Sequence, residues 1–444
     1  MTSRLNGLIK NRLARNIFGN YILKAISMAL SYVLTPVYMN YFSSNKVLGM
    51  WFTLIAIINW LIMLDFGIGA SARNSLIVAY EKKDNSEISK ILSSGLFVNT
   101  VIILVLCVIQ HILFENIDCY RFVGVTANEI SYKQLTLVIH ILSVGVLFRI
   151  YGSFLANVYY SLQNAMASSI MSISSNCLVL IYMLILEKSG GTKDIVSLAV
   201  AHAIAYNIPS IIAFIDLFVH KFKDIRIRLK YIKKTYIEQL TGVGLGFFYL
   251  QLIITIAFGS KELLISWFVG ADSVVEYNIY QKIIGMAGTL FGLALTPIWA
   301  EVSERYVRNE KKKIKLLYVK GIQFLALIGV GQMILVLAFP IINSIWLGSN
   351  AVTVSWSSMF VFSIYNIAYM LVMLNYNFLC GMGKVKILIE FLSLIVILGI
   401  IFSYVFTKLW PYWAVINIAI ICATVPSIIA MTKTVFKNIN EGCN

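Results

Sequence analysis

The placement of basic residues along an almost continuously apolar chain is the feature that most constrains its fold. Segments of roughly 20–25 apolar residues are long enough to cross a bilayer as helices. Twelve are predicted, at 17–40, 47–71, 91–113, 136–160, 167–187, 195–219, 240–262, 273–298, 317–341, 353–380, 384–407 and 411–434. The N-terminus and the connections after even-numbered segments, counted with the adjoining segment ends, hold 26 of the 36 lysines and arginines. Because basic loops stay in the cytoplasm, both termini are predicted to be cytoplasmic.

Composition excludes a soluble domain and indicates an all-α integral membrane protein. Hydrophobic residues make up 59% of the chain and its mean hydropathy is +0.83, so most of its surface needs lipid as solvent. The formal charge of +16 resides largely in basic runs at 221–234 and 305–320, on the predicted cytoplasmic side. There it orients the chain and meets anionic lipid head groups, so no nucleic-acid partner is expected. The four histidines and six cysteines show no metal-ligand spacing, and no metal or cofactor is predicted.

The chain divides into two halves of six predicted helices each. We expect an N-terminal six-helix bundle at 1–220, a basic cytoplasmic linker at 221–239 and a C-terminal six-helix bundle at 240–444. A weak repeat supports this division, since 41–51 resembles 267–277 and 154–155 matches 378–379 at nearly the same offset. Six is even, so both halves enter the membrane from the same side. The repeat is therefore parallel, with a pseudo-two-fold axis along the membrane normal and a predicted cleft between the bundles.

Charged residues within the predicted helices are the candidate functional residues. A charge at mid-bilayer costs about 2.5–3.5 kcal/mol, and both Arg149 and Lys282 lie near the middle of a segment. We expect them to line a polar cavity, although an ion pair inside one bundle is the alternative. Lys24 and Asp65 are predicted at the same depth, roughly 10 Å from the cytoplasmic side. Lys24 belongs either to the cationic cavity or to a salt bridge with Asp65.

Three further observations concern phosphate binding, ion coupling and glycan recognition. Arg73 follows the glycine-containing sequence LDFGIGASARN (64–74) at the cytoplasmic mouth, where it either holds a phosphate or only orients the chain. Glu390, within the eleventh segment, either couples transport to protons or sodium, as Asp65 would, or pairs with Lys384 or Lys386. Amides within the segments suit either sugar hydroxyls or helix packing. They include Asn20, Asn59, Asn157, Gln163, Asn176, Asn207, Gln251, Asn278, Gln281 and Asn375.

Four segments carry a resemblance to a known family. They are LTPVYMNYFSSNKVLGMWFTL (34–54), LDFGIGASARNSL (64–76), VVEYNIYQKI (274–283) and NFLCGMGKVK (377–386). With them the chain resembles the Wzx-type polysaccharide repeat-unit flippases of the multidrug, oligosaccharidyl-lipid and polysaccharide exporter superfamily. The resemblance implies two six-helix bundles around a cationic cleft. It also implies translocation of an undecaprenyl-pyrophosphate-linked oligosaccharide across the bacterial cytoplasmic membrane, with a polysaccharide polymerase and a chain-length regulator as partners.

Two other classes of protein compete with this interpretation. An ion-coupled multidrug antiporter of the same superfamily is the nearest alternative, but it is expected to bury more carboxylates and fewer cations. A membrane glycosyltransferase or polymerase is expected to have a large outer loop or an acidic metal-binding pair, and the chain contains no Asp-x-Asp. The intramembrane cations therefore favour a transporter of an anionic, lipid-linked glycan over an enzyme.

Overall fold

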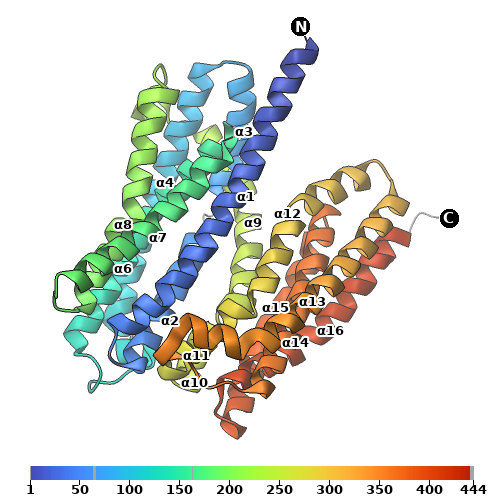
Figure 1. Ribbon diagram of the computed structural model, residues 1–444. Helices are drawn as coiled ribbons and strands as arrows, with labels where there is room; N and C mark the ends of the chain where they lie inside the picture. The colour runs from blue at the N-terminus through green and yellow to red at the C-terminus, as the bar shows by residue number, and fades with distance from the viewer. Residues whose placement is uncertain (1, 64–66, 163, 441–444) are drawn as a thin grey trace. The chain divides into compact units, whose positions relative to one another are not determined.

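The computed structural model describes residues 2–63, 67–162 and 164–440. Within its helices, the side chains of 2–18, 20–21, 24, 62–63, 70, 165, 243–247, 296–297 and 300 are not described. All regular secondary structure in these ranges is helical. The elements are α1 (Thr2–Tyr41), α2 (Asn45–Met63), α3 (Ile68–Glu81), α4 (Asn85–Asn116), α5 (Cys119–Val123), α6 (Tyr132–Ser161), α7 (Ala165–Lys188), α8 (Ile195–Asp216), η1 (Leu217–Lys221), η2 (Leu229–Tyr231), α9 (Lys234–Gly259), α10 (Lys261–Phe268), α11 (Ala271–Ile283), α12 (Met286–Val307), α13 (Lys311–Leu347), η3 (Gly348–Asn350), α14 (Trp356–Gly381), α15 (Val385–Leu409) and α16 (Trp413–Asn440) (Figure 1).

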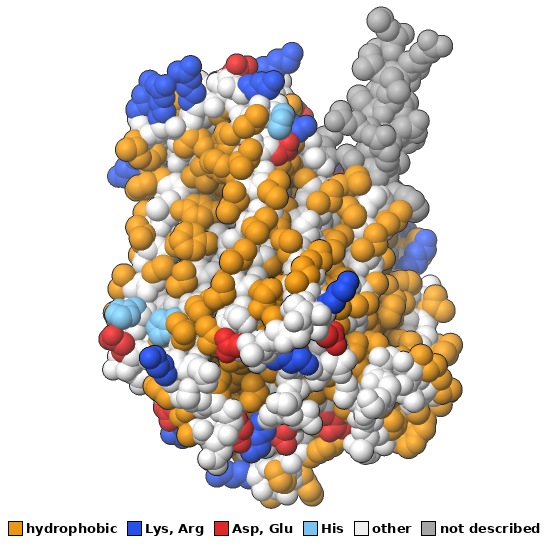
Figure 2. Space-filling model, turned by 60° about the vertical axis from the view of Figure 1, so that its left-hand side comes forward, with side chains coloured by type: hydrophobic (Ala, Val, Ile, Leu, Met, Phe, Trp, Pro, Cys, Tyr) orange, Lys and Arg blue, Asp and Glu red, His pale blue; other side chains and the backbone are white. Residues whose placement is uncertain are grey.

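Length and composition identify membrane-spanning helices directly. Within the described ranges, eight helices are long and apolar enough to cross a bilayer, and a ninth span results if α9 and α10 are taken together across their 47° bend. Figure 2 shows a face on which hydrophobic side chains cover the middle and charged side chains gather toward the two ends. The protein is therefore a multi-pass membrane protein. The total of twelve spans and the cytoplasmic placement of the termini stay predictions.

Two of the predicted spans are broken into two helices. The predicted span 47–71 is divided between α2 and α3, and Gly67 at the start of α3 adopts the left-handed conformation with φ of 67°. This conformation strains residues that carry a Cβ, so the glycine permits the new helix to begin there. The predicted span 273–298 is divided at Ile284–Gly285, between α11 and α12.

The helices form two compact units. The first comprises 1–43, 57–122 and 126–251, and its main helix pairs are α6 with α8, α1 with α7 and α3 with α6. The second comprises 44–56, 123–125 and 252–444, with α15 on α16, α12 on α14 and α14 on α16. In the second unit, a Cβ on Gly49 would lie 1.6 Å from the carbonyl oxygen of Ala271, so only glycine permits this approach.

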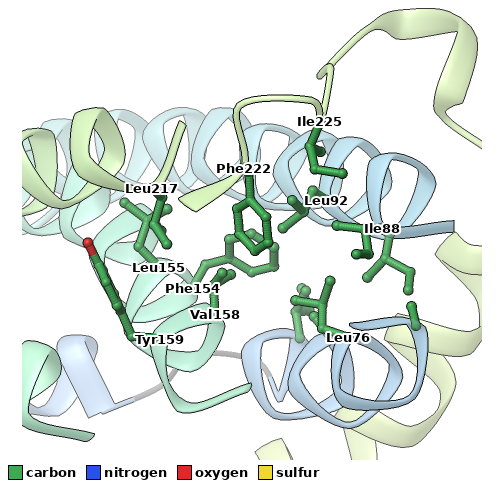
Figure 3. Packing of buried hydrophobic residues seen from close by; sticks show 14 of the residues in the cluster. Leu76, Ile88, Leu92, Phe154, Leu155, Val158, Tyr159, Leu217, Phe222 and Ile225 are labelled. Atoms are coloured by element: carbon green, nitrogen blue, oxygen red, sulfur yellow. The ribbon is translucent and has the colours of Figure 1, made fainter. Parts of the chain in front are cut away.

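A buried apolar cluster holds the first unit together at the ends of several helices. Phe154 from α6 and Phe222 from the segment after η1 pack side by side, with Leu92 of α4 against them (Figure 3). Leu76 of α3 closes the cluster, and Phe154 is only 2% exposed. A Cβ on Gly95 would lie 2.6 Å from the Phe154 ring, which explains the small residue in α4.

Candidate functional site

Arg149 lies in the middle of α6, partly buried against α8. Its Nη1 atom donates to the carbonyl oxygen of Tyr206 at 3.0 Å and to the Ser210 hydroxyl at 3.1 Å. Both partners are neutral. In the described part of the chain no carboxylate forms an ion pair with Arg149, and its Nε and Nη2 atoms have no hydrogen-bond partner. No described carboxylate therefore neutralises the guanidinium, which retains donors for a further acceptor.

Pro209 and Gly152 lie beside the contact between Arg149 and α8. Pro209 has no N–H, so it interrupts the hydrogen-bond ladder of α8 in the turn that Arg149 contacts. The arginine donates to a carbonyl of that same turn. Gly152 permits the close approach, because a Cβ there would lie 2.3 Å from the Ser210 hydroxyl and 3.3 Å from Arg149 Nη1. Arg149 thus joins α6 to α8 through one nitrogen and leaves two nitrogens for other contacts.

An apolar groove of about 850 Å³ runs beside this contact, between α6 and α8 with Leu96 of α4. Its few polar lining atoms include those of Ser210 and Asn207. The Asn207 amide donates to the carbonyls of Gly145 and Ala203 at 2.9 and 2.8 Å, so it holds the two helices together. Asn207, one of the predicted sugar-binding amides, therefore has a packing role. The groove suits an alkyl chain better than a sugar.

Arg73 lies at a different level of the first unit. It is exposed on α3, and its guanidinium carbon is 5.5 Å from the centroid of the Tyr160 ring of α6. Tyr160 follows Arg149 by eleven residues on α6, which corresponds to about 16 Å along the helix. The structure therefore places the two predicted arginines at different levels of α6: Arg149 lies on that helix, and Arg73 of α3 contacts it at Tyr160. The side chain of Lys24 and the whole of Asp65 lie outside the described residues, so their predicted salt bridge stays a prediction.

In the second unit, Lys282 and Glu390 occupy different environments. Lys282 is partly buried near the end of α11, two residues before the break at Ile284. Glu390 is exposed on α15, and among the described residues it forms no ion pair with Lys384 or Lys386. The predicted alternative role of Glu390, pairing one turn away, is therefore not observed.

A separate ion-pair cluster lies near the end of α12. On α12, Arg305 Nε donates to Glu301 at 2.6 Å, and Arg308 lies 2.7 Å from Glu304. These i, i+4 pairs on the helix surface stabilise the end of α12 modestly.

Sequence analysis missed the most deeply buried lysine that the structure describes. Lys261 was assigned to the outer end of a span, yet it is only 4% exposed at the start of α10. Three aromatic rings surround its Nζ atom, with centroids at 4.0, 5.3 and 5.8 Å: those of Tyr365, Tyr277 and Phe362. The rings come from α11 and α14, so no local pattern around Lys261 signals this environment.

The fold defines the class of protein. The structure resembles an inward-facing multidrug resistance MATE family transporter of the MOP superfamily, with a TM-score of 0.73, 13% identity and 96% of each chain covered. A MOP superfamily transporter from Pyrococcus furiosus, described as having a binding pocket of reverse polarity, matches with a TM-score of 0.66, 14% identity and 96% of each chain covered. The chain therefore has the fold of these MOP superfamily structures.

The family follows from the sequence comparison. The model of the polysaccharide biosynthesis protein family matches residues 13–303, and the chain belongs to this family. A Yersinia pseudotuberculosis protein named for O-antigen export is 22% identical over 347 residues, covering 76% of each chain. The family expected from the four sequence motifs is thus confirmed.

Proposed function

We propose that the protein translocates undecaprenyl-pyrophosphate-linked oligosaccharide repeat units from the cytoplasmic to the outer leaflet of the bacterial cytoplasmic membrane. Membership of the polysaccharide biosynthesis family and the MOP transporter fold support a role in glycan export. The observation that carries the proposal is Arg149, a partly buried cation in mid-helix whose two described partners are neutral oxygens. Such a guanidinium matches an anionic pyrophosphate, because charge-assisted hydrogen bonds to phosphate are strong and directional.

The proposed cycle is alternating access. Arg73, exposed at the predicted cytoplasmic mouth, meets the pyrophosphate first. Lys24, Arg149 and Lys282 then provide the cationic path, while the prenyl tail remains in lipid. Asp65 and Glu390 are the carboxylates proposed to couple transport to a proton or sodium gradient. A polysaccharide polymerase and a chain-length regulator are the proposed partners that use the translocated glycan.

Replacement of Arg149 by glutamine tests this proposal. Glutamine still offers an N–H donor to the α8 backbone but carries no charge. Since a hydrogen bond to a charged group contributes about 1.5–3 kcal/mol, we expect surface glycan display to fall about ten- to hundredfold. Arg149→Lys, which keeps the charge, should retain part of the activity. Display is measured in cells by glycan immunoblotting, with protein amount in the membrane as the reference.

Ser210→Ala is the matched control, because it removes one hydrogen bond of Arg149 without changing the charge. It should display glycan close to normally. Wild-type display by Arg149→Gln would contradict the role of the guanidinium.

Drug export is the second candidate function, since solved structures with this fold include multidrug resistance transporters. Antiport of cationic drugs requires anionic sites, and the described helices offer buried cations instead. Deletion of the gene should therefore remove surface glycan and leave drug susceptibility unchanged. The opposite result would favour the antiporter.

A further inference from the structure

Lys261 lies in the second unit and is not one of the residues of the proposed substrate path. Its Nζ atom lies nearest the Tyr365 ring, at 4.0 Å from the centroid, and 3.5 Å from the Oε1 atom of Gln281. The same Gln281 oxygen also accepts a hydrogen bond from the Tyr277 hydroxyl at 3.1 Å. Among the described side chains, no carboxylate lies within ion-pair distance of Lys261. A lysine is thus enclosed by rings and one shared amide oxygen.

Opposing contributions act on the two protonation states of this lysine. Each ring face attracts an ammonium, and more strongly when the pair is desolvated. Removing an ammonium from water costs several kcal/mol, which favours the neutral amine. The three rings and the one amide oxygen replace part of the hydration that the ammonium loses. The Lys261 amine can therefore gain or lose a proton when the packing around it changes.

The groups that face Lys261 are nearly all uncharged. On its own helix, Glu262 is the neighbouring carboxylate. From α11 the titratable neighbour is Tyr277, and from α14 it is Tyr365. On α15, which also packs on α10, Tyr404 contacts Phe268 and carries the ammonium of Lys408 over its ring. On α16, Trp413 packs against Tyr277.

The position of Lys261 in the chain determines the side from which protons reach it. The preceding helix α9 has 26 residues, about 39 Å, and begins in the predicted cytoplasmic linker. Lys261 therefore follows the end of α9 that lies toward the outer face. It is also the first residue after the 47° bend between α9 and α10, where a change in bend moves Nζ relative to the rings.

We propose that Lys261, with Glu262 beside it, is a proton-binding site that couples transport to the proton gradient. A proton from the outer aqueous phase binds the neutral Nζ amine and forms an ammonium held by the aromatic rings. Rearrangement of α10 then releases that proton to the cytoplasmic side, and no covalent bond changes. The proposal rests on the transport function proposed above, but it concerns the driving ion and not the substrate.

Two substitutions test the proposal, one that keeps a permanent positive charge at position 261 and one that removes the charge. Arginine at position 261 keeps the positive charge and does not release its proton, whereas methionine keeps the apolar stem without any charge. Wild-type and variant proteins are reconstituted in proteoliposomes with a fluorescent undecaprenyl-pyrophosphate-linked oligosaccharide. Net flipping is measured with and without an imposed proton gradient, and exchange between leaflets is measured without a gradient. Lys408→Met is the matched control, since Lys408 is an exposed lysine 4.6 Å from the centroid of the Tyr404 ring in the same unit.

Both Lys261→Arg and Lys261→Met should exchange substrate at the wild-type rate and lose all stimulation by the gradient. Lys408→Met should retain the stimulation. If either Lys261 variant keeps wild-type stimulation, the lysine is only a structural cation or a packing residue and the proposal is overturned. Loss of exchange in both variants also overturns it, because Lys261 would then serve substrate handling or folding. Absence of flipping by the wild-type protein would instead refute the proposed function.

Discussion

At the scale of the residue, polar side chains of the first unit mainly join helices to one another. Tyr159 of α6 is 3% exposed, and its hydroxyl donates to the Asp216 carboxylate at 2.6 Å. The other carboxylate oxygen of Asp216 lies 3.2 Å from Nδ1 of His220. Asp216 also lines a groove of about 580 Å³ between α7 and α8. Tyr159 therefore connects the end of α6 to the junction of α8 with η1.

Replacement of Tyr159 by phenylalanine tests this connection. The ring stays in the apolar cluster and only the hydrogen bond is lost, while the partly exposed carboxylate regains water. We expect the free energy of unfolding to fall by about 1 kcal/mol. Reversible unfolding in mixed detergent micelles measures it. Tyr160→Phe, at the adjacent partly buried ring that contacts the Arg73 guanidinium, should change stability by less, and an equal loss in both variants would indicate a nonspecific effect.

At the scale of the element, the turn between α14 and α15 shows how one motif residue fixes a helix end. Gly383 has φ of 71°, its N–H donates to the Cys380 carbonyl at 3.0 Å, and the Lys384 N–H donates to the Leu379 carbonyl at 2.8 Å. This is the Schellman arrangement, which favours glycine at the left-handed position. The glycine in the sequence NFLCGMGKVK therefore has a conformational reason to be there.

Alanine substitutions at two glycines separate conformation from packing. A Cβ on Gly383 or on Gly399 of α15 meets no atom within 4 Å, so neither substitution causes a clash and the backbone conformation decides the effect. Gly383→Ala should lower the free energy of unfolding by about 1 kcal/mol, because alanine is strained at positive φ. Gly399→Ala should raise it by about 0.5–1 kcal/mol through helix propensity. Thermal unfolding in detergent compares the two, and a shift of the same sign in both would contradict this explanation.

Apolar length predicts where helices lie, but it does not predict where they break for tertiary reasons. The break at Gly67 follows from the local sequence, since glycine is the residue that tolerates left-handed φ. The break between α9 and α10 likewise falls at Gly259 and Ser260, a pair at which helices often kink, whereas the packing of α10 on α11 and α15 is tertiary. For the same reason Arg149 was recognised from its depth in the sequence, whereas the aromatic surroundings of Lys261 were not.

At the scale of the whole molecule, charge distribution and apolar length constrain different properties. Helix length and hydropathy identify the membrane-spanning elements from the sequence alone. Orientation instead depends on which connections carry the lysines and arginines, and 26 of 36 fall on one predicted side. Each lysine or arginine near an anionic membrane surface contributes about 1 kcal/mol of attraction. The total for the 26 residues on the predicted cytoplasmic side therefore far exceeds the total for the seven on the opposite side. Orientation is therefore the strongest prediction that the sequence makes beyond the fold itself.

Single-cysteine labelling tests this orientation. In a variant without the native cysteines, Thr192→Cys and Ser349→Cys lie in connections predicted to be outside. Lys223→Cys and Lys312→Cys lie in the basic connections predicted to be inside, and all four positions are exposed. A membrane-impermeant maleimide should label the first two in intact spheroplasts and the second two only after permeabilisation. Each span moves the chain to the other side of the membrane. One missing or additional span between 192 and 349 would therefore place these two positions on opposite sides. Labelling of only one of them in intact spheroplasts would therefore disprove the parallel relation of the two halves.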